Sequence, residues 1–319
     1  MSQLWSRFAA HVRRLWPRWP LSGPAPFWLL AAFWAVRGQL RWEHAALALL
    51  STVLAYGSVW TKRLYLGILP IGLVGVLYDS MRLVKNVGLS PDSVHVCDVR
   101  AIDQRFFGLE LNGARATWHD YFQQHSFLPL DLYCAIPYGI FIGVVVAYSV
   151  YLFRRDYPGL QRFTWSFLAL NVAGFITYHV YPAAPPWYFH KYGCLVDLAT
   201  HASEGPNLAR VDAWLGIPYF AGVYGRSSDV FGAVPSLHVA YPLLMLLEGF
   251  RRHRWLGRVL LIWFYLSMCF AAVYLDHHWI FDVVLGSLYA VVISQLMRRL
   301  FNARFGVPSP SIAQPGAAK

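Results

Sequence analysis

The sequence predicts an all-α fold, a bundle of transmembrane helices. Of the 319 residues, 57% are hydrophobic and 13% are charged, whereas soluble domains carry about 25% charged residues. Several apolar runs reach or approach the roughly 20 residues that a helix needs to cross about 30 Å of hydrocarbon. The 14 Trp, 19 Tyr and 21 Phe fit interfacial belts better than stacking platforms for nucleic acid. We therefore expect an integral, polytopic membrane protein.

Residues 1–63 are predicted to be an interfacial segment followed by the first membrane helices. Phe27–Val36 is apolar but short for a span, and Ala45–Trp60 is longer. Lys62-Arg63 predicts a cytoplasmic turn after it. No cleavable signal peptide is expected, because no convincing small-residue cleavage site is found. Arginines interspersed with tryptophans favour an interfacial start, and these are Arg7, Arg13, Arg14 and Arg18.

Residues 64–304 are predicted to form a catalytic transmembrane bundle with two polar outer loops, 83–129 and 188–229. With a basic N-terminus on the same side as the later basic clusters, eight spans are favoured over seven. Residues 305–319, rich in Pro, Ser, Gly and Ala, are predicted to be a disordered tail. The spans expected within the bundle are Leu64–Leu77, Asp131–Phe153, Arg162–Tyr181, Val239–Leu247, Trp255–Tyr274 and Val283–Met297.

The basic clusters predict the orientation of the bundle. Lys62-Arg63, Arg154-Arg155, Arg251–Arg254 and Arg298-Arg299 all fall on one side if every run between them crosses. The positive side is normally cytoplasmic, so the opposite side faces the periplasm or lumen. This bias, together with attraction to anionic lipid headgroups, accounts for the net charge of +11. We therefore expect no nucleic acid partner.

Two histidine motifs carry the predicted chemistry. His238 directly precedes one apolar run, and His278 directly precedes the last one, with Asp282 four residues further on. On a helix, this spacing puts His278 and Asp282 on one face. An aspartate so placed accepts a hydrogen bond from one imidazole nitrogen and leaves the other free to attack. Because a single span, Trp255–Tyr274, separates the motifs, both are expected on the outer side.

The helix starts beside these histidines predict positions for phosphate. Pro235 and Ser236 suit the first turn and the N-cap of a helix, and backbone N–H groups at such a start bind phosphate oxygens. Asp276 and the histidine pair precede the last run in the same way. His277 points about 100° away from His278 on a helix, and it is interpreted either as a secondary contact or as a structural residue.

Metal and serine chemistry are the alternatives for these motifs. Several histidines and aspartates are enough to hold zinc, but no two histidines have the His-x-x-x-His spacing on one helix. Ser236 lacks the Gly-x-Ser-x-Gly elbow of a serine hydrolase. We therefore expect neither a metal nor another cofactor.

The four cysteines predict little chemistry. Cys134 and Cys269 lie in membrane runs, where a small buried apolar residue is expected. Cys97 and Cys194 fall in the two outer loops, and whether they pair is left open, because pairing depends on geometry.

The motifs resemble those of a known superfamily. Pro235–His238 and His278–Asp282 are similar to the second and third motifs of the type-2 phosphatidic acid phosphatases. The arginine usual six residues before the third-motif histidine is Ala272 here, and the first motif is missing. The chain resembles instead the branch that contains the inositol phosphorylceramide synthases, over about Tyr78 to Gly286. The motifs of that branch are Tyr78–Arg82, Asp131–Tyr138, Tyr181–Trp187, Phe231–His238, and His277-His278 with Asp282.

This resemblance implies a six-helix core and a role for each matched residue. It implies that His278 attacks phosphorus and that Asp282 orients the His278 ring. It also implies that His238 protonates the leaving alkoxide and then deprotonates the incoming hydroxyl. Since the usual arginine is absent, Arg82 and Arg226 are the cations expected to bind phosphate. Other contacts with phosphate or substrate are expected from Tyr78, Asp79, Asp131, Tyr138, Pro186, Trp187, Ser236 and His277.

The implied function is transfer of a phospholipid headgroup. The expected partners are a phospholipid donor, phosphatidylinositol, and a ceramide-like acceptor, while the oligomeric state is not predicted. One alternative is a lipid phosphate phosphatase that uses water as acceptor; the aromatic loop 83–129 favours transfer because a lid excludes water. The other is a non-catalytic lipid-binding or transport protein, which has no need of Asp282 four residues after a histidine.

Overall fold

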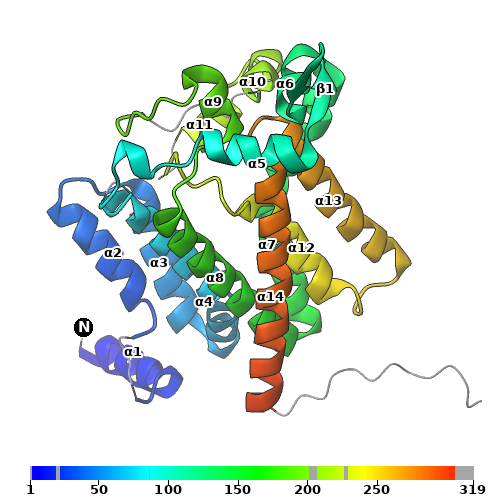
Figure 1. Ribbon diagram of the computed structural model, residues 1–319. Helices are drawn as coiled ribbons and strands as arrows, with labels where there is room; N and C mark the ends of the chain where they lie inside the picture. Colours follow the sequence, from blue (N-terminus) through cyan, green and yellow to red (C-terminus); the bar gives the residue numbers. More distant parts are fainter. Residues whose placement is uncertain (1, 19–21, 86, 201–206, 226–228, 306–319) are drawn as a thin grey trace, which may run out of the picture.

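The computed structural model describes residues 2–18, 22–85, 87–200, 207–225 and 229–305, and it confirms the all-α fold. Long helices form a bundle, and short helices with one small hairpin cover one end of it (Figure 1). We call this covering layer the cap, which within the described ranges consists of residues 81–127 and 181–235. Arg226 lies outside the described residues, as does the predicted tail except Phe305, which is the last residue of a helix.

The apolar runs expected in the membrane are helical, except that the run Ala45–Trp60 is interrupted at Ser58 between two helices. By length and hydropathy, four of the described helices are able to cross a membrane, namely α4, α7, α13 and α14, while α2 and α12 are shorter apolar helices. These helices mark an integral membrane protein. The bundle comprises α2 (Ala25–Val36), α3 (Trp42–Gly57), α4 (Val59–Ser80), α7 (Leu128–Arg155), α8 (Tyr157–Val180), α12 (Leu237–Gly249), α13 (Trp255–Tyr274) and α14 (Ile280–Phe305).

The boundary between α3 and α4 differs from the expectation. The turn lies at Ser58, and Lys62-Arg63 occupies the first turns of α4. The Oγ of Ser58 accepts a hydrogen bond from the N–H of Thr61 at 3.1 Å, and the N–H of Ser58 donates to Oγ1 of Thr61 at 2.8 Å. The turn predicted at the basic pair was wrong because this reciprocal cap, not the charge, sets the start of the helix.

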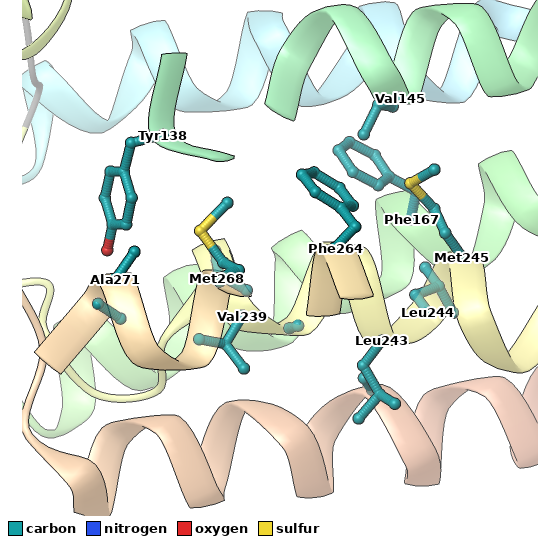
Figure 2. Close-up of a cluster of buried hydrophobic side chains, with 14 of the residues drawn as sticks. Tyr138, Val145, Phe167, Val239, Leu243, Leu244, Met245, Phe264, Met268 and Ala271 are labelled. Carbon is teal, nitrogen blue, oxygen red and sulfur yellow. The ribbon is translucent and has the colours of Figure 1, made fainter. Parts of the chain in front are cut away.

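Helix α12 forms the centre of the bundle. It packs against α7, α8, α13 and α14, and most of its 13 residues are buried. Figure 2 shows Val239 and Leu244 of α12 in the cluster that also holds Phe264 and Met268 of α13. The first turn of this central helix carries one of the two predicted histidines.

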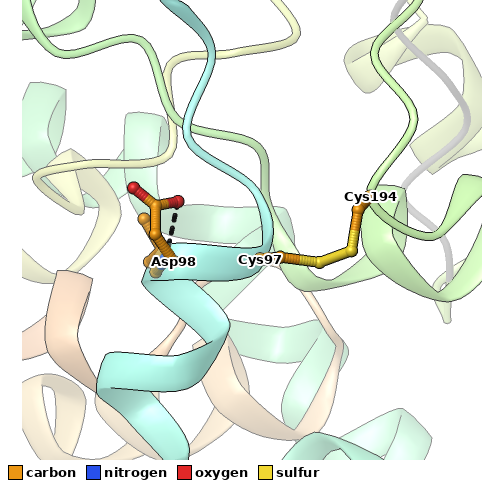
Figure 3. Close-up of a disulfide and its surroundings, with 4 residues drawn as sticks. Cys97, Asp98 and Cys194 are labelled. Carbon is orange, nitrogen blue, oxygen red and sulfur yellow. Dashed lines mark hydrogen bonds between the residues drawn. A yellow bond between two sulfur atoms is a disulfide. The ribbon is translucent and has the colours of Figure 1, made fainter. Parts of the chain in front are cut away.

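The cap consists of short elements tied to one another. Two 3₁₀ turns, Met81–Leu83 and Pro91–Ser93, come first, and an antiparallel hairpin pairs β1 (Leu109–Leu111) with β2 (Ala114–Ala116). Cys97 and Cys194 form a disulfide with Cα atoms 5.5 Å apart, which settles the pairing that the sequence left open (Figure 3). The cap helices are α5 (Cys97–Phe107), α6 (Trp118–Gln124), α9 (Pro186–Tyr192), α10 (Ala209–Leu215) and α11 (Tyr219–Tyr224).

Basic residues gather at the end of the bundle opposite the cap. The buried carboxylate of Glu248 in α12 accepts hydrogen bonds from Nε of Arg162 at 2.7 Å and from Nε of Arg298 at 3.1 Å. Arg252 lies 3.6 Å from the same carboxylate. Helix α1 (Ser2–Leu15) lies at this end too (Figure 1). The basic clusters therefore share one end of the bundle, and which side of the membrane that end faces stays a prediction.

Candidate active site

The histidines of the two motifs meet at the cap end of the bundle. His238 lies in the first turn of α12, and His278 lies in the turn between α13 and α14. Nδ1 of His238 is 3.1 Å from Nε2 of His278, which is a hydrogen-bond distance. The expected approach of two imidazoles far apart in the sequence is thus present in the fold.

The backbone carbonyl of Ala233 fixes the tautomer of His278. Nδ1 of His278 lies 3.0 Å from this oxygen, and because a carbonyl oxygen only accepts, Nδ1–H is the donor. In the neutral ring Nε2 then carries the lone pair and accepts the Nδ1–H of His238. The nitrogen of His278 that carries the lone pair therefore faces the second histidine.

Asp282 lies close to His278 but does not make the expected hydrogen bond. Its Oδ2 is 3.7 Å from Nδ1 of His278 and accepts the backbone N–H of Trp279 at 2.9 Å. The prediction that His278 and Asp282 share one helical face was wrong, because α14 begins at Ile280 and His278 lies in the turn before it. The buried carboxylate thus caps the start of α14 and faces the imidazole at ion-pair distance, while Ala233 orients the ring.

The chain segment before α12 packs tightly onto α14. Ser236 is the N-cap of α12, with its Oγ 3.4 Å from the N–H of Val239, and its own N–H donates to the carbonyl of Asp282 at 3.0 Å. A Cβ on Gly286 would lie 2.2 Å from the carbonyl oxygen of Ser236. A glycine is therefore required where the two motif backbones meet. This contact fixes the position of the turn that carries His238 relative to the turn that carries His278.

A cavity of about 420 Å³ opens beside the histidine pair. Its walls are mostly apolar side chains from α4, α7 and α8, including Ile71, Val145 and Phe175. His238 and His278 line its polar end. Tyr78, one of the expected contact residues, also lines it. The cavity therefore offers an apolar space next to the two paired imidazoles.

Several polar groups around the histidines lack a partner within the described part of the chain. The ring of Tyr138 stacks on His238 with centroids 4.9 Å apart and meets His277 at 4.8 Å. Among the described residues, no hydrogen-bond partner is found for the hydroxyls of Tyr138 and Tyr224, for Nε2 of His277 or for Oδ1 of Asp282. Buried polar atoms without partners are costly and rare in packed cores. Their concentration here distinguishes this region as a candidate binding site.

Asp79 and Arg82 belong to an ion cluster at the end of α4. Asp79 accepts a hydrogen bond from Arg41 and lies 3.1 Å from Nε2 of His44. Nε of Arg82 is 3.7 Å from the same carboxylate. Asp79 and Arg82 therefore face each other within an ion cluster that also contains Arg41, the residue directly before α3.

Asp131 has a partner that the sequence reasoning missed. Its two oxygens accept Nε and Nη2 of Arg210 at 2.8 and 2.7 Å, and the hydroxyl of Tyr274 donates to Oδ1 at 2.7 Å. This bidentate pair joins α7 to the cap helix α10. The fold thus gives Asp131 a direct role in holding the cap.

A second histidine–aspartate cluster lies beside the third motif, and the sequence analysis did not single it out as a group. His190 in α9 is placed between the carboxylates of Asp120 and Asp276, with His119 next to Asp276. Burial disfavours the charged ring, but hydrogen bonds to both carboxylates raise the pKa of His190 to about 9. Among the described residues, no group of three or more His, Cys, Asp or Glu is placed to hold a metal ion.

The last predicted contact residues form the start of α9. Pro186 is its first residue, and the N–H of Trp187 donates to the carbonyl of Asp276 at 3.1 Å. This bond places α9 against the turn that carries His278. No residue pattern in the polar loops predicted these contacts, because the contacts join segments that are about 90 residues apart in the sequence.

Comparison with known proteins places the chain in a family. The model of the PAP2 superfamily matches residues 108–296, which include both histidine motifs. A phosphoinositol dihydroceramide synthase of Bacteroides thetaiotaomicron is 34% identical over 249 residues, 77% of this chain and 81% of that protein.

Two fungal relatives match as well. The inositol phosphorylceramide synthase catalytic subunits of Saccharomyces cerevisiae and Schizosaccharomyces pombe are 31% and 27% identical over 74% and 73% of this chain. The chain spans 57% and 53% of their lengths. No solved structure gives a significant match. The chain belongs to the PAP2 superfamily, in its inositol phosphorylceramide synthase-like branch, and is an enzyme of that phosphotransferase class.

Proposed function

We propose that this enzyme moves phosphoinositol from phosphatidylinositol to the hydroxyl of a ceramide-like lipid through a phosphohistidine on His278. The observation that carries the proposal is the contact between Nδ1 of His238 and Nε2 of His278 at the polar end of an apolar cavity. The names of the relatives support inositol phosphate as the group transferred and a ceramide as the acceptor.

The first half-reaction forms the covalent intermediate. The lone pair on Nε2 of His278 attacks phosphorus, and the bond from phosphorus to the diacylglycerol oxygen breaks. His238, as the imidazolium, gives its proton to the departing alkoxide. In-line attack requires the His238 ring to turn away from Nε2, because the rings are one hydrogen bond apart and phosphorus must enter between them.

The second half-reaction reverses these roles. His238 is now neutral and takes the proton of the acceptor hydroxyl, whose oxygen attacks phosphorus while the bond from phosphorus to Nε2 breaks. Nδ1–H of His278 stays on the Ala233 carbonyl throughout, so the ring keeps its orientation in both steps. A donated Nδ1–H also stabilises the positive charge that develops on the ring when Nε2 bonds to phosphorus.

The surroundings of the histidines favour a lipid acceptor over water. The cavity is bounded by apolar side chains such as Ile71, Val145 and Phe175, which suit acyl chains. The cap covers this end of the bundle (Figure 1), and a covered site limits the access of water to a phosphohistidine. Arg82 directly follows Met81, which lines the cavity, and it is the described cation that we assign to the phosphate.

The test is product analysis with purified protein in detergent. Phosphatidylinositol labelled in its headgroup phosphate is offered with ceramide, with diacylglycerol and with water alone. We expect label in a ceramide product. When the protein is denatured without acid during turnover, we also expect labelled phosphoinositol to be bound to His278. Release of inositol phosphate at the same rate with and without ceramide would identify a phosphatase instead. Lipid binding without any labelled product would identify a non-catalytic protein.

A further inference from the structure

The turn that carries the third-motif histidines is held in an uncommon conformation. Asp276 has φ of +65°, in the left-handed region that residues other than glycine rarely adopt. His277 and His278 follow it directly. A residue persists in this region only where its surroundings determine it. The position of the nucleophile therefore depends on what holds Asp276.

The contacts that hold Asp276 come from the cap. Its buried carboxylate accepts Nε2–H of Gln123 at 3.0 Å and Nδ1–H of His190 at 2.7 Å. Nδ1 of His119 lies 3.2 Å from the other oxygen. Gln123 and His119 belong to α6, and His190 belongs to α9. Two cap helices thus converge on one carboxylate next to the active site.

The geometry of His190 requires a doubly protonated ring. Nδ1 is 2.7 Å from Asp276, and Nε2 is 3.1 Å from Oδ1 of Asp120. Ionised carboxylates only accept hydrogen bonds, so both ring nitrogens carry a proton. Asp120 is held in turn by Arg100 of α5 at 2.7 Å. Positive and negative side chains therefore alternate in a series of contacts from α5 to the catalytic turn, in the order Arg100, Asp120, His190 and Asp276.

We propose that His190, as an imidazolium bridging Asp120 and Asp276, is a positioning residue that fixes the turn carrying His278. The proposal rests on the proposed function, because it assigns His278 as the nucleophile. His190 acts on the turn through Asp276. When the bridge is lost, the left-handed turn relaxes and Nε2 of His278 leaves its place beside His238.

The proposal implies a loss of activity at alkaline pH. Burial disfavours the imidazolium, but the two carboxylates raise the pKa of His190 to about 9 from its ordinary value of 6.5. Its contribution is therefore complete below about pH 6.5 and is lost as the pH rises through about 9. The titratable and charged groups that face His190 or its carboxylates are Asp120, Asp276, His119 and Arg100. On its own helix, Lys191 follows His190 and lies over the ring of Tyr192.

The decisive variant is His190→Gln, compared with the wild type from pH 7 to pH 10. At pH 7.5 we expect kcat of the variant to fall on the order of tenfold to a hundredfold, since a displacement of about 1 Å has that effect. KM for the lipids should stay constant. The decline of kcat near pH 9 should be present in the wild type and absent in the variant.

His95→Gln is the matched control. His95 also pairs with an aspartate of the cap, Asp98, but has no contact with Asp276. We expect this variant to keep the wild-type kcat and the decline near pH 9. An alkaline decline that persists unchanged in His190→Gln would overturn the proposal, as would a variant that loses thermal stability with kcat per folded molecule intact.

A second measurement does not depend on turnover. Carbethoxylation of His278 by diethyl pyrocarbonate, followed by mass spectrometry, reports the accessibility of the ring. At pH 7.5 His278 should react several times faster in His190→Gln than in the wild type or in His95→Gln. Equal rates would overturn the positioning role even if the transfer reaction itself were absent, so failure of this proposal is distinguishable from failure of the proposed function.

Discussion

The two ends of helix α12 carry buried polar clusters of opposite character. At the basic end, Glu248 is surrounded by Arg162, Arg252 and Arg298, and both of its oxygens have partners. At the cap end, His238 touches His278 among hydroxyl and ring atoms that have no hydrogen-bond partner in the described chain. Only the cap end adjoins the apolar cavity.

The difference is the one expected between a structural cluster and the proposed catalytic one. A buried charged group whose atoms all have hydrogen-bond partners holds helices together. Removing it leaves the opposite charges of its partners buried and unpaired. Buried polar atoms without hydrogen-bond partners destabilise the fold unless a ligand forms hydrogen bonds with them. Both clusters lie on one helix of 13 residues, so a matched substitution at each end compares the two roles directly.

The largest effect is expected at the cap end. His278→Ala should lower transfer on the order of 10⁴-fold, as removal of a covalent nucleophile does. The unfolding temperature should change little, because the ring makes only two hydrogen bonds in the described structure, one to the Ala233 carbonyl and one with His238. Activity is measured with labelled phosphatidylinositol and unfolding by tryptophan fluorescence. Full activity in purified His278→Ala would end the covalent scheme.

The basic end should give the reverse result. Glu248→Ala leaves three arginines without their shared carboxylate, and we expect a loss of about 3–5 kcal/mol in the free energy of unfolding. The kcat per folded molecule should hardly change, because Glu248 lies at the opposite end of the helix from the histidines. A stable variant with low kcat would show that the comparison between the two ends is wrong.

The cavity is tested by filling it from a helix glycine. Gly75 of α4 lines the cavity, and a Cβ added there meets no atom within 4 Å. Gly75→Phe should raise KM for the lipid on the order of tenfold by occupying space that the substrate needs. Gly143 of α7 also has open space but does not line this cavity. Gly143→Phe should keep the wild-type KM, and equal effects would refute the assignment of the cavity.

The smallest effect concerns one hydroxyl. Tyr138→Phe removes an oxygen without a protein partner in the described structure, so stability should be unchanged. We expect kcat to fall about fivefold, the equivalent of one hydrogen bond. Tyr274→Phe is the contrast, since its hydroxyl donates to Asp131 at 2.7 Å. That variant should lower the unfolding temperature, and a lower unfolding temperature in Tyr138→Phe would indicate an unrecognised structural bond.

Hydropathy and basic clusters were enough to predict the bundle. The apolar runs are helical apart from a break at Ser58, since a membrane requires every backbone polar group to be satisfied within its segment. The approach of His238 to His278 followed from counting one span between them. The start of α4 was misplaced because a serine cap is a local signal that charge patterns do not contain.

Contacts within the polar loops were beyond the sequence. The loops lack a hydrophobic period, so nothing indicates which side chains of the cap face one another. Arg210 was not considered as a partner of Asp131, and His190 was not linked to Asp276, although each pair is well formed. The hydrogen bond from His278 to Ala233 was missed for a related reason, because any residue type supplies a carbonyl.

The shortness of α12 has a consequence for the depth of the reaction. Ten residues separate Glu248 from His238, and at 1.5 Å per residue this is a rise of about 15 Å. If the arginines around Glu248 lie at one membrane surface, the His238 ring, with His278 beside it, sits roughly half the hydrocarbon thickness away from it. A phosphorylated headgroup that reaches these rings must then sink below the plane of its neighbours.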